Sequence, residues 1–196
     1  MLVAQLFFIA AGVYLGNQAD GYKERREQRA LLRSTLQNFR ADFASNRTAV
    51  ARVSPYHAAL HQRLTATARD SGLLAVPAQS WDAFTARLRF EGMRPVGYSD
   101  AAWDLALATR ALPLLEPGLR FEIAELYRSQ RIASETQAQF MAAAFTPQTF
   151  ALPSPQPLAV AMTAYLGDVV LIEPALLRRY ETLLPRLDTL IARLPK

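Results

Sequence analysis

Apolar side chains recur at alternating spacings of four and three between residues 23 and 53, a stretch without Pro or Gly. The positions of this packing seam are Leu32, Leu36, Phe39, Phe43, Asn46, Val50 and Val53. The repeat predicts one long amphipathic helix. Two phenylalanines favour packing of this helix into a bundle of the same chain, and a coiled coil between two chains is the alternative. Asn46 either sets the register of such a coiled coil or faces a helix end.

The first sixteen residues carry no charge and are almost wholly apolar, and a basic stretch follows them. This pattern predicts a transmembrane anchor over residues 1–20. The span includes Leu6, Phe7, Phe8, Ile9, Gly12 and Gly16. A helix over residues 2–16 is roughly 22 Å long, short of the ~30 Å hydrocarbon core, so residues 17–19 must reach the headgroups. A signal peptide is the alternative, but no basic segment precedes the apolar run and no strong cleavage site follows it.

The net charge of +5 is concentrated in the helix that follows the anchor. Residues 21–52 hold eight basic and three acidic side chains, whereas residues 53–196 hold 14 basic and 13 acidic ones. We expect headgroup contacts from Lys23, Arg25, Arg26 and Arg29. Each is worth about 1 kcal/mol beside an anionic lipid surface. Because the bilayer accounts for this basic cluster, nucleic acid is not an expected partner.

Proline and glycine divide the next part of the chain. A second helix is expected to begin at Ser54 and Pro55, because proline is favoured in the first turn of a helix, and to end near residue 70. Ser80 is the expected N-cap of a helix over residues 81–90. Further helices are expected from residue 101 to about 112 and from Pro117 onward.

The C-terminal part contains a second nearly uncharged run over residues 158–172. It is short and contains Asp168, so a buried core helix is favoured over a second membrane span. Pro185 is expected to kink the apolar helix that follows. Alternation with a period of two is nowhere sustained, which favours an all-α fold.

The predicted architecture is therefore an N-terminal transmembrane helix that continues into a long amphipathic helix packing in a helical bundle. We divide the chain into the anchor at 1–20, a juxtamembrane amphipathic helix at 21–53 and a helical bundle domain at 54–196.

Residues 6–18 have the sequence LFFIAAGVYLGNQ, and a charged helix with Leu31, Leu32 and Leu36 follows them. Together these segments resemble the opening of an uncharacterised family of bacterial single-pass membrane-anchored all-helical proteins. The sequence YSDAAW at residues 98–103 also resembles this family. The resemblance implies the cell inner membrane but no activity, because the family has no assigned chemistry. The basic cluster after the span places the bundle in the cytoplasm, whereas a start further upstream with a basic stretch, as such proteins often carry, would place it in the periplasm.

No motif indicates catalysis. The sequence has no G-x-S-x-G, no glycine-rich phosphate loop, no dinucleotide fingerprint and no Cys. His57 and His61 lie four residues apart, a spacing that two metal ligands can use, but Ala58 stands where a zincin has glutamate and no third ligand is evident. We interpret both histidines as polar side chains on an exposed or basic face, and expect no catalytic residue, no cofactor and no metal.

These features favour a membrane-anchored helical interaction protein, an accessory subunit or scaffold and not an enzyme. Its expected partners are the lipid bilayer and either a second copy or the other subunits of a membrane complex. The G-x-x-x-G spacing of Gly12 and Gly16 can bring two anchors close together. The alternative is a membrane-tethered sensor domain with a ligand cavity lined by Trp81, Trp103 and Tyr127.

Overall fold

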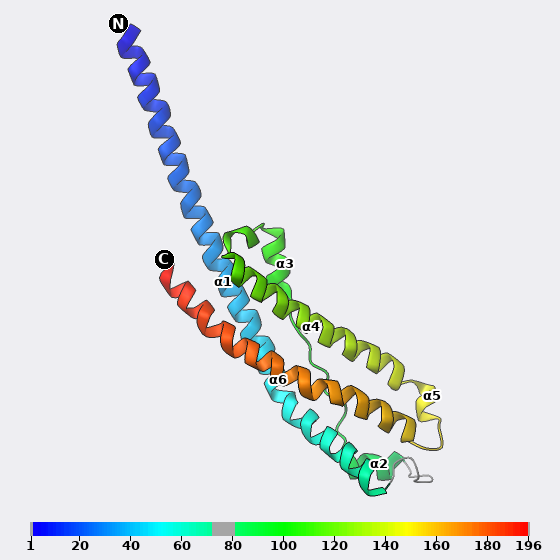
Figure 1. Cartoon of the computed structure of the whole chain (residues 1–196). Coiled ribbons are helices and arrows are strands. Elements are labelled where there is room, and N and C mark those ends of the chain that lie inside the picture. The colour runs from blue at the N-terminus through cyan, green and yellow to red at the C-terminus, as the bar shows by residue number, and fades with distance from the viewer. Residues whose placement is uncertain (1, 72–80, 196) are drawn as a thin grey trace.

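The computed structural model describes the backbone of residues 2–71 and 81–195, and the side chains of residues 21–67 and 81–195. In these ranges the chain forms six α-helices and one short 3-10 helix, with no strand, so the all-α prediction is confirmed (Figure 1). The elements are α1 (Leu2–Ser71), α2 (Trp81–Leu88), α3 (Ala101–Ala108), η1 (Leu112–Leu114), α4 (Pro117–Ala144), α5 (Pro147–Phe150) and α6 (Gln156–Arg193). The expected cap Ser80 lies outside the described residues.

Helix α1 runs for 70 residues without a break. Its N-terminal part projects beyond the other helices, and its C-terminal part packs mainly against α6 (Figure 1). The prediction of a new helix at Ser54 and Pro55 is wrong, because Pro55 lies inside α1. Val53 and His57 are buried on either side of the exposed proline. Tertiary packing on both sides therefore keeps the helix continuous, although proline cannot donate its backbone hydrogen bond.

Helix α6 likewise merges two segments that the sequence suggested were separate. It continues through Pro174 and Pro185 for 38 residues and buries ten of them in the bundle. The buried residues of the apolar run are Leu158, Ala159, Met162, Leu166 and Val169. Among the described residues, α6 is the one helix long and apolar enough to cross a membrane, and 33% of that window is buried inside the protein.

The seam of α1 faces the main core. Leu36, Phe39, Phe43, Val50 and Val53 are buried there, and Leu32 packs half-buried against the same cluster. Phe43 lies with its ring centroid 5.1 Å from that of Tyr127 on α4 and 6.1 Å from that of Tyr180 on α6. A second cluster around Leu60 and Leu64 joins the far end of α1 to α2 and to the start of α6. The seam of α1 is therefore covered within the chain.

Helix α3 ends earlier than the sequence suggested. It stops at Ala108 and not near Leu112. Arg110 adopts φ +54°, and the amide of Ala111 donates to the carbonyl of Ala106 at 2.9 Å. This pattern is a Schellman cap, in which a left-handed residue closes the last helical turn.

Candidate functional site

A groove with a volume of about 550 Å³ lies beside α1 where this helix leaves the bundle. Its lining includes Tyr22, Arg25, Arg26, Arg29, Arg33 and Pro195. Except for Pro195, these residues lie three or four positions apart along α1, with Arg25 and Arg26 adjacent to each other, so that they share one face of the helix. We call this site the basic groove.

The C-terminal residues complete the basic groove. Helix α6 returns along α1, so that the C-terminus lies beside the segment where α1 leaves the bundle (Figure 1). Arg33 Nη1 donates hydrogen bonds to the carbonyl oxygens of Leu194 at 2.7 Å and Pro195 at 3.2 Å. This contact joins residues 161 positions apart and holds Pro195 in the lining.

Three arginines of the basic groove have no counter-charge. Arg25, Arg26 and Arg29 are exposed, and within the described part of the chain none of them forms an ion pair or a hydrogen bond. Lys23 does not line the groove and lies 3.9 Å from the carboxylate of Glu27. The four residues predicted to contact headgroups are thus all exposed, but only the arginines share the groove.

The guanidinium of Arg25 extends back along α1. Its Nη1 lies 3.8 Å from the position that a Cβ atom would take at Gly21, one turn toward the N-terminus. Helical side chains lean in this direction because the Cα–Cβ bond tilts toward the helix start. The backbone of residues 6–16 belongs to α1, but the side chains of the predicted span lie outside the described set.

The two histidines do not form a metal site. His57 is 2% exposed, so the prediction of an exposed or basic face is wrong for this residue. Its Nδ1 lies 2.7 Å from Glu173 Oε1, and its Nε2 lies 2.8 Å from the carbonyl oxygen of Met93. Both neighbours accept hydrogen bonds, which fits a doubly protonated imidazolium that donates to each. His61 is half-buried, and the described side chains contain no group of three His, Asp or Glu that could hold a metal ion.

Asn46 makes its hydrogen bonds within the chain. Its Nδ2 donates to the carbonyl of Ser99 at 2.8 Å and to Gln130 Oε1 at 3.3 Å, and Ser99 N donates to Asn46 Oδ1 at 2.9 Å. Gln130 Nε2 then donates to the hydroxyl of Tyr180 at 2.9 Å. The polar seam residue therefore fixes the segment before α3 against α1 and α4.

The three aromatic residues of the suggested sensor cavity do not all meet, because Trp81 lies in a different cluster from Trp103 and Tyr127. Trp103 packs in the main core with its ring centroid 5.6 Å from that of Tyr127. Trp81 packs in the second cluster, against Phe84 and Phe150. A cavity lined by all three side chains is therefore not formed.

A second groove, of about 580 Å³, lies between α4 and α6. Its lining includes Phe121, Glu122, Glu125, Arg178, Arg179 and Leu183. Phe121 is 67% exposed, because it lies off the stripe of Leu119, Ile123 and Leu126 that α4 buries at spacings of four and three. We call this site the α4–α6 groove.

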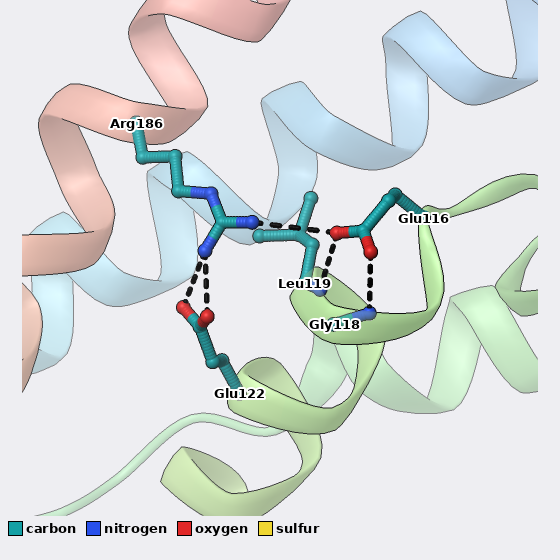
Figure 2. Close-up of polar contacts among 5 residues, drawn as sticks. All are labelled: Glu116, Gly118, Leu119, Glu122 and Arg186. Atoms are coloured by element: carbon teal, nitrogen blue, oxygen red, sulfur yellow. Dashed lines mark hydrogen bonds and ion pairs between the residues drawn. The ribbon is translucent and has the colours of Figure 1, made fainter.

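Beside the α4–α6 groove, Arg186 of α6 bridges two carboxylates (Figure 2). One belongs to Glu122 in α4 and the other to Glu116, the N-cap residue of α4. Its Nη1 donates to Glu122 at 2.6 Å and 2.7 Å, and its Nη2 to Glu116 at 3.4 Å. Glu116 in turn accepts from the amides of Gly118 and Leu119 at 2.8 Å and 2.9 Å. These contacts join the start of α4 to α6 beside the groove.

Comparison with known proteins finds no match to a protein family, to a curated protein or to a solved structure. The resemblance of residues 6–18 to bacterial membrane-anchored proteins thus stays a prediction.

Proposed function

We propose that this chain is a single-pass protein of the bacterial inner membrane, in which residues 1–20 are the anchor and the helical bundle works by contact with other proteins. The observation that carries this proposal is the continuity of α1, which runs without a break from an uncharged apolar stretch into the core of the bundle. One helix is then both the tether and a central packing element. This arrangement suits a scaffold or an accessory subunit. We assign no catalytic step to the chain.

The charge distribution supports the N-terminal stretch as the anchor. Arg25, Arg26 and Arg29 follow it directly and are exposed, as expected of side chains at a membrane surface. The other apolar helix, α6, is better explained as a core helix. It carries the buried Glu173 and Tyr180, whose polar groups pair with α1 and α4 and would lose these partners in lipid.

The α4–α6 groove supports the contact function. Phe121 exposes a large aromatic side chain beside Leu183, and Glu122, Arg178 and Arg179 surround them with charge. An apolar centre with a charged rim is the usual composition of a protein interface. The partner is a second copy or another subunit of a membrane complex.

Membrane fractionation of the full chain tests the anchor. Ile9→Arg places a charge in the apolar stretch at a cost of about 2.5–3.5 kcal/mol, so it should release a large share of the protein into the alkaline carbonate supernatant. Ala51→Arg adds the same charge at an exposed site of α1 and should leave the protein in the pellet. The anchor is ruled out if the unmodified chain, with Met1 attached, is recovered free after lysis without detergent.

Photo-crosslinking in membranes tests the contact function. A photoreactive residue at Phe121 should give one reproducible adduct, whereas the same group at Gln62, an exposed position of α1, should give none. An adduct of twice the chain mass identifies a second copy, and any other mass identifies a different subunit. Equal, diffuse labelling from both positions would exclude the α4–α6 groove as the interface.

A further inference from the structure

We propose that the basic groove binds the phosphate group of one anionic phospholipid, as a defined site and not as a general attraction to a charged surface. This inference rests on the proposed membrane anchor, because the lipid must be held at the level of the groove. Three observations carry it: the free arginines, their depth relative to the anchor and the wall formed by the C-terminus.

The first observation is the chemistry of the lining. Arg25, Arg26 and Arg29 present three guanidinium groups that have no partner among the described residues. Guanidinium groups donate paired hydrogen bonds that match the oxygens of a phosphate, which a lysine ammonium cannot do. The groove therefore favours a phosphate over a less charged headgroup.

The second observation is position along α1. With the anchor ending at residue 20, Gly21 lies about 1.5 Å beyond the hydrocarbon boundary, inside a headgroup layer that is roughly 5–8 Å thick. Arg25 Nη1 lies 3.8 Å from the Cβ position of Gly21, so its guanidinium reaches this depth. Arg29 is one turn farther along and leans in the same direction. A free polyanion needs no such placement, whereas the phosphate of a lipid does.

The third observation is the shape of the site. Arg33 is engaged by the carbonyls of Leu194 and Pro195, so the chain end provides a wall that an isolated helix lacks. Tyr22 is 67% exposed at the opposite end, and a tyrosine is favoured at the junction of lipid and water. A volume of about 550 Å³ accommodates a glycerophosphate headgroup.

The chain supplies a matched control for this site. Lys23 carries the same charge within one turn of Arg25 and Arg26, its side chain is 77% exposed, and it lies outside the groove beside Glu27. General attraction to a charged surface predicts equal effects from Lys23→Gln, Arg25→Gln and Arg29→Gln. A defined site predicts that only the two arginine substitutions matter, and that Arg29→Lys does not restore binding.

The experiment is lipid titration of the full chain in neutral detergent micelles, followed by native mass spectrometry. Phosphatidylglycerol is added, with phosphatidylcholine as the neutral comparison and inorganic phosphate or glycerol phosphate as soluble competitors. We expect one bound phosphatidylglycerol per chain, at least about tenfold tighter than phosphatidylcholine. Arg25→Gln and Arg29→Gln should each weaken binding by about tenfold, and Lys23→Gln by less than about twofold.

Three outcomes would overturn the assignment. Equal losses for all three substitutions would leave only a general surface attraction. Displacement by inorganic phosphate at millimolar concentration would make the ligand a soluble anion, and binding of an RNA oligonucleotide with the same arginine dependence would make it a nucleic acid. Membrane fractionation of the same variants separates this result from the anchor, because they should stay in the carbonate pellet even when lipid selectivity is lost.

Discussion

His57 on α1 and Glu173 on α6 form a buried ion pair, with Nδ1 and Oε1 2.7 Å apart and both side chains at most 5% exposed. The second ring nitrogen contacts the carbonyl of Met93, so the pair also holds the segment between α2 and α3. Glu173 Oε2 is buried without a hydrogen bond to any described residue. The protonation of His57 therefore affects the contacts of α1 with α6 and with the segment between α2 and α3.

Stability should depend on the protonation of His57. Burial lowers the pKa of this imidazole, but the hydrogen bond and the negative charge of Glu173, together with the hydrogen bond to the Met93 carbonyl, outweigh it, so that the net shift is upward from 6.5. Because the folded-state pKa is the higher one, the pair stabilises the fold fully below pH 6.5 and loses this contribution as pH rises through the raised pKa.

Chemical unfolding of the full chain in detergent, followed by circular dichroism, measures this effect. The free energy of unfolding should fall as pH rises above 6.5 in the unmodified protein, and Glu173→Gln should abolish the decrease. His61→Gln changes the other, half-buried histidine and should preserve it. A slope that survives Glu173→Gln would contradict the role of the pair.

Replacing Asn46 should destabilise the bundle. Asn46→Ala removes three hydrogen bonds and leaves the Ser99 backbone and Gln130 without their partner. The expected loss is about 2–4 kcal/mol of unfolding free energy, because buried polar groups are left unpaired. Asn38→Ala changes a half-buried asparagine of the same helix, without a hydrogen bond among described residues, and should cost less than about 0.5 kcal/mol. Similar losses for both would refute this account.

Pro55 offers a test of helix continuity. In an unbroken α1, Pro55→Ala restores the backbone hydrogen bond to the carbonyl of Ala51 and should raise the unfolding free energy by up to about 3 kcal/mol. At the first turn of a separate helix, the same substitution would be neutral or destabilising, because proline is favoured there. Hydrogen exchange across residues 51–58 should slow in the variant. Faster exchange would argue for a break.

The N-terminus of α4 should loosen in acid. Hydrogen bonds from the amides of Gly118 and Leu119, with a contribution from Arg186, lower the pKa of Glu116 below 4.5. A lowered folded-state pKa means that the cap is fully effective above pH 4.5 and is lost as pH falls through the lower value.

Protection factors of the two capped amides, at Gly118 and Leu119, measure this loss. They should fall in acid for the unmodified chain. Glu116→Gln should give weaker protection without the pH dependence, and Glu135→Gln, at an exposed site of α4, should behave as the unmodified chain. Unchanged protection at pH 3 would exclude the carboxylate as the cap.

Local pattern predicted the helices well, because helix formation depends on side chains three and four residues apart. The spacing from Leu32 to Val53 identified the buried face of α1, and Pro117 marked the start of α4. The same local rules failed at Pro55. Local sequence rules place a helix boundary at proline, whereas packing against distant segments can offset the hydrogen bond that proline does not make.

The sequence by itself determined that the chain is helical, which face of α1 is apolar and where basic charge collects. The tertiary structure decided which distant groups meet: Glu173 lies 116 residues from His57, and Leu194 lies 161 residues from Arg33. No spacing rule relates such positions, because their proximity results from α6 folding back along α1. The basic residues were therefore visible in the sequence, but the groove that they line exists only in the fold.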